Sequence, residues 1–498
     1  MMTTMISELE FQSLAAQGYN RIPLVSSAFA DLETPLSLYL KLCGADGQGA
    51  RSFLLESVVG GERFGRYSFI GLPARTVLKS FGMTTEVQCD GVVIETHQGN
   101  PLAFIEAYQQ RFKVALQPGL PRFCGGLAGY FGYDAVRYME PKLAKTEKTG
   151  GLNTPDVMLL QCEELAVIDN ISGRLYLIVY ADPAGPGAYA RAQQRLAELR
   201  DKLGRSVAAP QVKPAQAHPV EREFSKADYI DAVLKAKELI ANGDLMQVQV
   251  GQRLRKRYAE SPLSLYRALR SLNPSPYMYF YDMGDFQIVG ASPEILVRQE
   301  QTPLGQKVTI RPLAGTRPRG VTPEQDQALE VELKADPKER AEHLMLIDLA
   351  RNDIGRIAKT GSVKVTDAFA VERYSHVMHI VSNVEGMLLD GTSNLDVLKA
   401  TFPAGTLTGA PKIRAMEVID ELEPVKRGLY GGACGYLSFA GDMDLAIAIR
   451  TGIIKDQVLY VQAAAGVVAD SVPELEWQET EAKARALIRA ADLVEEGF

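Results

Sequence analysis

The segment from Tyr430 to Lys483 constrains the fold most, because short apolar runs alternate there with turn residues. Residues 430–437 and 445–450 flank Gly441-Asp442, which is the pattern of a β-hairpin. A third apolar run returns beyond this pair and narrows to small residues over 458–466. Small side chains at a strand end allow a ligand to approach the backbone. The segment therefore predicts a meander of strands with room for a ligand at one end.

A helix is expected after this meander, with Ser471 and Glu474 forming its capping box. Within the helix, Glu476, Glu479 and Lys483 have the spacing i, i+3, i+7, which places their side chains on one face. Acidic residues at this spacing are common on solvated helices, so the pair alone identifies no site.

Arg450 ends one of the strand-like runs among small and apolar residues. Alternation along a strand places its side chain on the same face as Ala446 and Ala448. A buried guanidinium needs an anionic partner, because an unpaired buried charge is very costly. Two partners are possible at this point, an acidic residue of the same chain or an anionic ligand.

Length, charge and cysteine content limit the classes of protein. The 498 residues exceed one typical core and predict two or three domains. With 54 basic and 61 acidic residues the net charge is −7, which gives no general electrostatic case for nucleic acid or an anionic membrane. Five scattered cysteines without a CxxC pair fit a reducing cytosol and offer no zinc framework. Without an apolar leader or membrane-spanning run, a cytoplasmic protein is expected.

The clearest linker covers residues 206–223, which are rich in Ala, Pro, Gln and Val and lack helical periodicity. We expect a sheet-rich domain over 1–220 and a second domain over 221–498. The glycines at 125–132 are spaced three apart, as in some phosphate-binding loops. Aromatic residues interleave them and no Lys-Ser/Thr follows, so a tightly packed strand is predicted instead.

A second acidic pair lies far from the first, on a helix predicted over residues 338–351. Glu339 and Glu342 are again three apart. Carboxylates without histidine or cysteine suit Mg²⁺, which usually takes one or two protein carboxylates together with substrate and water oxygens. Arg450 and Lys483 could then hold a second acid group. The residues alone favour either an Mg²⁺-assisted enzyme for a small polyanion or two unrelated solvated helix faces.

Several blocks carry a specific resemblance, in the same order along the chain. They are Ser292-Pro-Glu294, Arg311–Arg319, Lys338–Asp353, Arg373–His379 and Gly405–Lys412. Through them the chain resembles the chorismate-utilising enzymes over nearly its whole length, and most closely the large components of anthranilate synthases. The resemblance implies an α+β fold in which large antiparallel sheets form a sandwich-like core wrapped by helices. It also implies Mg²⁺-dependent conversion of chorismate and ammonia to anthranilate and pyruvate, the first committed step of tryptophan biosynthesis.

The resemblance also implies roles for individual residues. Three positions match catalytic residues of the family: Glu294, which would protonate the departing 4-hydroxyl, His379, tied to pyruvate elimination, and Thr406. The Mg²⁺ carboxylates would be Glu342 and Glu479, with Glu339 and Glu476 as direct or water-mediated partners. The substrate-binding positions would be Gly315, Thr316, Tyr430, Arg450, Ala464, Ala465, Gly466 and Lys483.

One of these positions departs from the family pattern. Relatives usually carry Gly-Ala-Gly or Gly-Gly-Gly where this chain has Ala464-Ala465-Gly466. An alanine at 464 still presents its N–H if its φ is negative, whereas a positive φ would strain it.

Two positions choose among the relatives. Ala314 stands where aminodeoxychorismate synthases carry a lysine nucleophile, and Gln247 stands where isochorismate and salicylate synthases carry a lysine that activates water. Both favour anthranilate synthesis over the alternatives, aminodeoxychorismate or 2-amino-2-deoxyisochorismate synthesis. A non-enzyme alternative is an inactive regulatory subunit of an amidotransferase complex.

The resemblance further implies partners and an inhibitor. The chain has no Gly-x-Cys-x-Gly motif for glutaminase chemistry, so ammonia would come from a separate glutamine amidotransferase small subunit, in a heterotetramer. Leu54–Ser57 and Asn273–Met278 match segments that form a feedback pocket in the family. Its tryptophan-binding residues would be Ser57, Pro276, Tyr277 and Met278, with inhibition by a population shift between open and closed arrangements.

Overall fold

The computed structural model describes residues 6–44, 50–58, 65–145, 148–208, 210, 212, 214, 216–374 and 377–497. Within these residues the strands form two large antiparallel sheets. The first sheet has the order β1 (Ile22–Phe29), β10 (Arg174–Ala181), β9 (Glu164–Asp169), β3 (Tyr67–Gly71), β2 (Ser52–Glu56), β13 (Tyr277–Asp282), β14 (Phe286–Ser292), β23 (Thr451–Lys455), β24 (Val458–Val467), β12 (Gln247–Arg257) and β11 (Val220–Arg222), with β20 (Gly409–Ala410) paired to β12.

The second sheet has the order β17 (Leu313–Pro318), β19 (Val377–Met387), β16 (Gly305–Ile310), β15 (Ile295–Thr302), β22 (Met443–Ile447), β21 (Ala433–Ser438), β7 (Gly126–Phe131), β8 (Val157–Cys162), β4 (Thr76–Phe81), β5 (Thr84–Cys89) and β6 (Val92–Gln98), with β18 (Lys364–Arg373) paired to β19. Ser375 and His376, within the family-like block at 373–379, lie outside the described residues.

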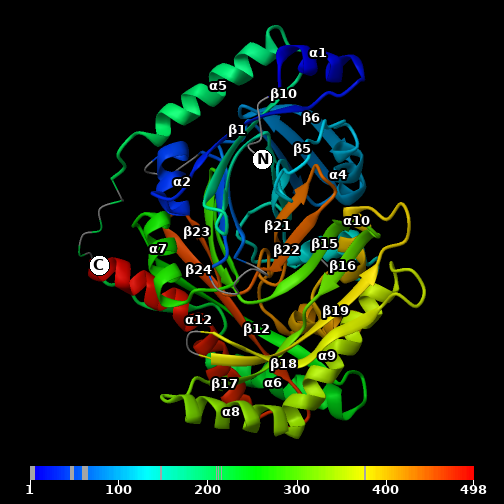
Figure 1. Ribbon diagram of the computed structural model, residues 1–498. Coiled ribbons are helices and arrows are strands. Elements are labelled where there is room, and N and C mark those ends of the chain that lie inside the picture. Colours follow the sequence, from blue (N-terminus) through cyan, green and yellow to red (C-terminus); the bar gives the residue numbers. More distant parts are fainter. Residues whose placement is uncertain are drawn as a thin grey trace.

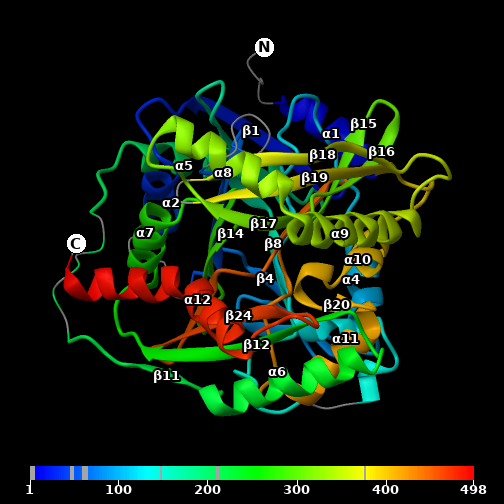
Figure 2. The same cartoon turned by 90° about the horizontal axis from the view of Figure 1, so that it is seen from below.

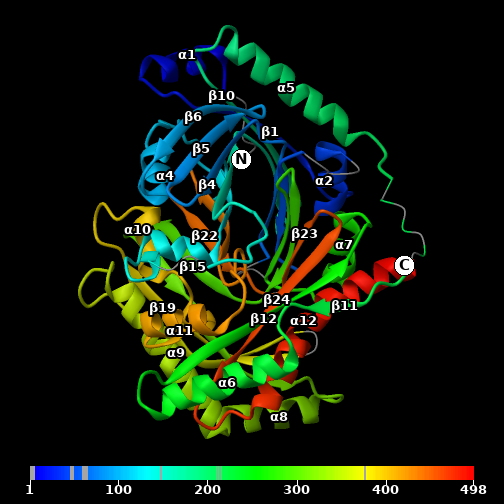
Figure 3. The same ribbon diagram turned by 180° about the vertical axis from the view of Figure 1, so that it is seen from behind.

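Helices wrap both sheets. They are α1 (Glu8–Ala16), α2 (Pro35–Cys43), α4 (Pro101–Gln109), α5 (Ala188–Leu203), α6 (Lys226–Ala241), α7 (Pro262–Leu272), α8 (Pro323–Ala335), α9 (Pro337–Gly355), α10 (Asn394–Thr401), α11 (Lys412–Leu422) and α12 (Pro473–Glu496), with 3₁₀ turns η1 (Tyr133–Tyr138), η2 (Leu143–Lys145) and η3 (Gly405–Leu407). Figure 1 shows α6, α8, α9 and α12 around the lower part of the molecule, and Figure 3 shows α1 and α5 across the top. No helix in the described part of the chain is both long and apolar enough to cross a bilayer.

The core between the sheets takes side chains from both. It contains Phe53 and Tyr281 from the first sheet and Tyr130 and Tyr436 from the second, all buried. Helices α2, α5, α7 and α12 cover the outer face of the first sheet, and α4, α9 and α10 cover the second. Apolar burial on both faces of each sheet supplies the main stabilisation. The predicted α+β architecture, a sandwich wrapped by helices, is confirmed.

Both sheets are continuous across the division predicted near residue 220. Strand β2 pairs with β13 in the first sheet, with Leu55 opposite Tyr279. In the second sheet β7 pairs with β21, with Gly129 opposite Gly435. The segments 1–220 and 221–498 therefore share two sheets and the core between them, and their division into two domains stays a prediction.

The glycine-rich segment at 125–132 forms strand β7, as predicted. A Cβ on Gly129 would lie 2.1 Å from the carbonyl oxygen of Met158, and one on Gly435 would lie 2.0 Å from that of Asp444. Heavy atoms cannot approach so closely, so the glycines here allow strands to pack tightly and form no phosphate loop.

The meander of the last third is divided between the sheets. The hairpin β21–β22 turns at Gly441 and belongs to the second sheet, whereas β23–β24 belongs to the first. Strand β22 ends at Ile447, and the chain crosses between the sheets over residues 448–450. The prediction that Arg450 ends a strand is therefore wrong. Its φ is +52°, a left-handed conformation, so strand alternation does not determine its direction.

Side chains cap the starts of two helices, whereas the cap predicted for α12 is wrong. Thr34 and Ser225 cap α2 and α6 through their side chains. At α12, however, the N-cap is Val472, which makes no side-chain hydrogen bond. The hydroxyl of Ser471 accepts from the backbone N–H of Val468 at 3.0 Å instead. This hydroxyl therefore stabilises the preceding turn and does not form the capping box that we expected.

Candidate active site

A cavity of about 610 Å³ opens where the crossover, β17, β19, η3 and the helices α9 and α12 converge. Figure 2 shows α9 to the right of the centre and α12 to the left of it. Twelve of the predicted site residues line this cavity: Glu294, Gly315, Thr316, Glu339, Glu342, His379, Thr406, Tyr430, Arg450, Ala464, Glu479 and Lys483. Ala465, Gly466 and Glu476 are not among its lining residues. Residues far apart in the sequence therefore share one space.

Glu294 lies in the turn between β14 and β15 and is 7% exposed. Its carbonyl oxygen accepts from the N–H of Ile447 at 3.0 Å, and its carboxylate oxygen Oε2 accepts from the Thr406 hydroxyl at 3.4 Å. Burial raises the pKa of Glu294 to about 8, although the Thr406 hydroxyl, the Leu313 backbone and nearby positive charges oppose the rise. At neutral pH this carboxyl is protonated and can donate a proton.

His379 is held as a neutral imidazole. Burial lowers its pKa to about 4. Its Nδ1 lies 3.0 Å from the carbonyl oxygen of Gly315 and 3.0 Å from the hydroxyl of Thr316. Because a carbonyl can only accept, Nδ1–H donates to it, and Nε2 is left as the basic nitrogen. Gly315 has φ +69° at an irregularity of β17, a conformation that favours glycine and aims this carbonyl at the ring.

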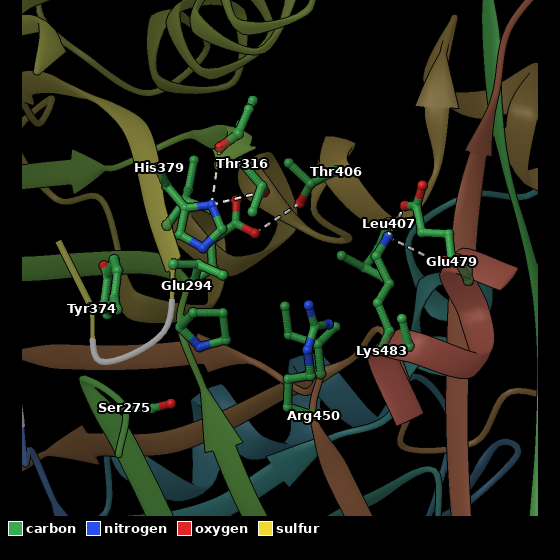
Figure 4. A pocket seen from close by; sticks show the side chains of 18 of the residues that line it. Ser275, Glu294, Thr316, Tyr374, His379, Thr406, Leu407, Arg450, Glu479 and Lys483 are labelled. Atoms are coloured by element: carbon green, nitrogen blue, oxygen red, sulfur yellow. Dashed lines mark hydrogen bonds and ion pairs between the residues drawn. The ribbon is translucent and has the colours of Figure 1, made fainter. Parts of the chain in front are cut away.

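Arg450 is largely buried and has no internal salt bridge among the described residues, since no carboxylate lies within 4.0 Å of its guanidinium. Burial lowers the pKa of Arg450, while Tyr430, Glu479 and Glu294 raise it from a distance. Figure 4 shows the guanidinium pointing into the space across from Glu294 and His379. The internal ion pair left open by the sequence is therefore excluded within this part of the chain, and the guanidinium lines the cavity within reach of an anionic ligand.

Strand β24 forms the wall beside Lys483. The ammonium group of Lys483 donates to the carbonyl oxygen of Ala464 at 2.9 Å and lies 2.6 Å from Glu479. Ala464 is within the strand and is not in the left-handed region, so alanine causes no strain here. Ala465 is fully buried. A Cβ on Gly466 would lie 2.8 Å from the side-chain amide nitrogens of both Gln247 and Gln249, so a larger residue here would require these two side chains to move.

Three of the four carboxylates of the two acidic pairs, Glu339, Glu342 and Glu479, line the same cavity. Asp336 caps α9 by accepting from the N–H groups of Lys338 and Glu339 at 2.9 and 3.3 Å, which fixes the direction of the first turn. Burial, and then repulsion from Glu342, raise the pKa of Glu339. Burial also raises the pKa of Glu476. The alternative of two unrelated solvated faces does not hold, since both helices present carboxylates to one cavity.

These carboxylates do not form a compact cluster. Over the described ranges, no group of three or more His, Cys, Asp or Glu side chains is close enough to hold a metal ion. Glu339 also lies 3.6 Å from the guanidinium of Arg317. The donors available to a cation are thus separate carboxylates on α9 and α12.

A smaller cavity of about 50 Å³ lies beside the first, between the sheets. Ser57, Pro276, Tyr277 and Met278, the four predicted inhibitor-binding residues, all line it. The hydroxyl of Tyr277 donates to Asp444 at 3.1 Å, and Asp444 lies 2.7 Å from Arg298. The preceding residues 273–275 line the large cavity, so one short segment contacts both.

Some residues that line the large cavity belong to the family-like blocks, but no role was predicted for them from the sequence. Tyr374 belongs to the same block as His379, and their rings are 5.6 Å apart at an interplanar angle of 63°. Its hydroxyl donates to Glu372 at 3.0 Å. The side chain of Gln249 lies close to Gly466. Gln249 was not predicted as a site residue, because nothing in the sequence distinguishes it from the other residues of a buried strand. Gln247 and Ala314, used above to choose among relatives, also line the cavity.

Comparison with known proteins gives a consistent assignment. The family model described as chorismate binding enzyme matches residues 66–489. The chain is 58% identical to anthranilate synthase component 1 of Neisseria meningitidis serogroup A over 99% of this chain and 100% of that protein. It is 54% identical to that of Pseudomonas aeruginosa over 98% of this chain and 99% of the relative.

Solved structures agree with this assignment. Anthranilate synthase component I from Streptococcus pneumoniae superimposes with a TM-score of 0.75 at 38% identity, covering 93% of this chain and 99% of that one. The menaquinone-specific isochorismate synthase of Escherichia coli has a TM-score of 0.70 at 19% identity, covering 97% and 98%, and shares the fold. The chain belongs to the anthranilate synthase component 1 family of chorismate binding enzymes.

Proposed function

We propose that this chain is the synthase subunit of anthranilate synthase and converts chorismate and ammonia into anthranilate and pyruvate. The observation that carries the proposal is the largely buried guanidinium of Arg450, which has no carboxylate partner within the described residues and lines the large cavity. Chorismate has two carboxylates, one on its ring and one on its enolpyruvyl group. A dianion with separated acid groups suits a cavity with Arg450 on one wall and acidic helices on another.

The donor set on α9 and α12 fits Mg²⁺, because it consists of hard carboxylate oxygens without histidine or cysteine. Glu342 and Glu479 would hold the ion, assisted by Glu339 and Glu476. Because Mg²⁺ usually takes only one or two protein carboxylates, separate side chains are sufficient. The bound ion would hold and polarise the ring carboxylate. Burial, and to a smaller extent repulsion from the neighbouring carboxylate, raises the pKa values of Glu339 and Glu476, and a cation between the helices would offset both effects.

The residues of the chain then divide the chemistry. Arg450, Tyr430 and the backbone amides of strand β24 bind the enolpyruvyl carboxylate and orient the ring. Glu294 donates its proton to the departing 4-hydroxyl, which leaves as water while ammonia attacks C2. In the second step Nε2 of His379 removes the proton from C2, and the C–O bond between the ring and the enolpyruvyl group breaks as the ring becomes aromatic. The released enolpyruvate takes up a proton at its methylene carbon and becomes pyruvate.

Two cavity residues support ammonia as the nucleophile. Ala314 provides no amine, and Gln247 cannot activate water as a lysine would. These side chains argue against aminodeoxychorismate synthesis and isochorismate-type chemistry. The presence of the whole set of acid, base, cation and carboxylate groups in one cavity argues against an inactive regulatory subunit.

Ammonia delivery would require a second protein. Relatives are called component 1, and none of the five free cysteines here is suited to glutaminase chemistry. Burial raises the pKa of the Cys43 thiol to about 12 and also raises that of Cys124. We propose a glutamine amidotransferase small subunit as the partner, in a heterotetramer. Free thiols also suit a cytoplasmic location.

We propose tryptophan as the inhibitor, bound in the small cavity. A cavity of about 50 Å³ is smaller than an aromatic amino acid, so binding would require the pocket to widen. Because residues 273–278 line both cavities in succession, widening one would move a wall of the other. This link supports inhibition by a shift between two arrangements of the sheets.

The first prediction concerns the product. The purified chain with Mg²⁺, chorismate and ammonium is expected to release anthranilate, followed by its fluorescence, and an equal amount of pyruvate. Glutamine should not replace ammonium, and tryptophan, but not phenylalanine, should inhibit. An aminated product that retains its pyruvyl group by mass spectrometry would instead show the alternative synthase activity, and absence of any product would refute the enzyme proposal.

The second prediction concerns the proton donor. Glu294 donates only when protonated, so kcat is expected to fall as the pH rises through about 8. The change Glu294→Gln should lower kcat by about 10²–10⁴-fold and abolish this limb, since an amide cannot donate the proton. Glu300→Gln, on the following strand and outside the cavity lining, is the control. A pH profile that retains its alkaline limb in Glu294→Gln would contradict the assignment.

The third prediction concerns the metal. Glu479→Gln is expected to raise the Mg²⁺ concentration for half-maximal activity by about 10–100-fold, because it removes a charged oxygen donor. Glu474→Gln is a matched control on the same helix, since both side chains are 46% exposed and each pairs with a lysine. Calorimetric titration of Mg²⁺ in the presence of chorismate checks the result without turnover. Equal Mg²⁺ affinities for the two variants would refute Glu479 as a ligand.

A further inference from the structure

A buried ion pair lies behind the active-site cavity without lining it. Glu423 follows α11, and Arg427 lies on the loop that leads to Tyr430. The side chains of Glu423 and Arg427 are each 2% exposed. The guanidinium donates Nε–H to Glu423 Oε2 at 2.9 Å and Nη2–H to Oε1 at 2.7 Å. Two parallel donors to one carboxylate fix the plane of the guanidinium.

The remaining donors of Arg427 bind backbone carbonyls of two other elements. Nη1–H donates to the carbonyl oxygen of Leu407 in η3 at 2.7 Å, and Nη2–H reaches that of Gln249 in β12 at 3.3 Å. Glu423 in turn accepts from the N–H of Gly251 at 2.7 Å. A Cβ at Gly251 would lie 2.9 Å from that carboxylate oxygen, so the lack of a side chain at this position of the strand leaves room for the ion pair. One ion pair thus ties a loop, a strand and a 3₁₀ turn together.

The same guanidinium also contacts two aromatic rings. Its Cζ lies 4.6 Å from the ring centre of Tyr133 and 5.5 Å from that of Tyr430. A cation over a ring face is attracted by the ring quadrupole, more strongly where water is absent. Gln249, Leu407 and Tyr430 all line the large cavity, whereas Arg427 does not. Apart from Glu423 and Tyr133, the residues that the Arg427 guanidinium contacts in these interactions therefore all line the active-site cavity.

Stability alone does not account for this pair. Removing two charges from water is expensive, and a well-packed apolar pair of similar volume is often as stable or more so. An apolar pair, however, would leave the Leu407 carbonyl and the Gly251 N–H without these partners. A lysine would keep the charge but lacks the planar fork that reaches a carboxylate and two carbonyls together.

We propose that Arg427, locked by Glu423, is a positioning residue that holds Tyr430 and the Thr406–Leu407 turn in the geometry required for catalysis. This inference rests on the proposed function. Leu407 follows Thr406, whose hydroxyl contacts the carboxylate of Glu294. Tyr430 lies against the backbone of Ala464 in β24. Arg427 thereby connects the proton-donating side of the cavity with its anion-binding side.

The test replaces Arg427 by lysine in the full chain and measures anthranilate formation from chorismate and ammonium. Misplacement by about 1 Å can cost about 10²-fold, so we expect kcat/KM of Arg427→Lys to fall by that order. Arg21→Lys is the matched control, because Arg21 pairs with Glu163, donates to the Asn20 carbonyl at 2.7 Å and lies 5.2 Å from the ring centre of Phe112. None of these three partners lines the large cavity, and kcat/KM of Arg21→Lys should stay within about twofold of the wild type.

A double-mutant cycle distinguishes positioning from general loss of structure. If Arg427 acts through the threonine turn, Arg427→Lys should cost clearly less in the background of Thr406→Val than in the wild type. Full additivity, with the two losses simply multiplying, would overturn the inference. So would an Arg427→Lys enzyme with the activity of the Arg21→Lys control.

Two further outcomes, an Arg427→Lys variant that does not fold and a wild-type chain without activity, have different meanings. If Arg427→Lys does not fold, as judged by circular dichroism, the variant Glu423→Gln with Arg427→Met removes both charges together and leaves neither buried alone. A folded double variant with wild-type kcat/KM would overturn the inference, and one reduced by about 10²-fold would support it. A wild-type chain that makes no anthranilate would instead overturn the proposed function, and the positioning role with it.

Discussion

The active site depends on one positive charge placed where the chain passes between its two sheets. Strand β22 ends at Ile447 and β23 begins at Thr451, so Arg450 belongs to neither sheet. Its left-handed backbone turns the side chain into the cavity, and no carboxylate of the described chain neutralises it. A buried charge of this kind costs free energy until an anion binds. Burying this charge therefore lowers the stability of the fold, and in return the site is ready to bind an acid group.

This placement of Arg450 is possible because both sheets continue across the division near residue 220. The second sheet presents Glu294, Gly315 and His379 from one side, while β24 of the first sheet presents its backbone from the other. Helices α9 and α12, which lie on the right and on the left in Figure 2, then bring carboxylates to the same cavity. Opposite charges therefore face one space from different walls, which suits a dianionic substrate that needs a cation at one end and a guanidinium at the other. The ion pair of Glu423 and Arg427 stiffens the wall that joins them.

Local sequence patterns predicted the elements well and their assembly less well. Strands bounded by glycine turns and helices started by Thr34 and Ser225 follow from short-range chemistry, and the structure confirms them. The end of β22 was misplaced because an apolar run such as 445–449 reads the same whether it continues in a strand or crosses between sheets. The cap at Ser471 failed because its hydroxyl had a competing partner in the preceding turn.

The site residues came mainly from family-like blocks, since spacing alone left solvated faces and a salt bridge as alternatives. The structure brings twelve of them to one cavity but leaves Ala465, Gly466 and Glu476 outside its lining. Arg427 went unnoticed, because a basic residue four positions after an acidic one is an ordinary pattern on solvated chain. Its role becomes visible only from its burial and from its contacts in the fold, which are with Glu423, Leu407, Gln249, Tyr133 and Tyr430.

The most direct test of this account measures chorismate binding to Arg450→Gln by calorimetry, with Mg²⁺ and without ammonia. If the guanidinium binds a carboxylate of the substrate, affinity should fall by about 10²-fold or more, since truncating a buried charge partner costs about 2–5 kcal/mol. The ligand-free variant should unfold at the same or a higher temperature, because an unpaired buried charge has been removed. Undiminished chorismate affinity together with a lower unfolding temperature would contradict the account and show that Arg450 serves the fold.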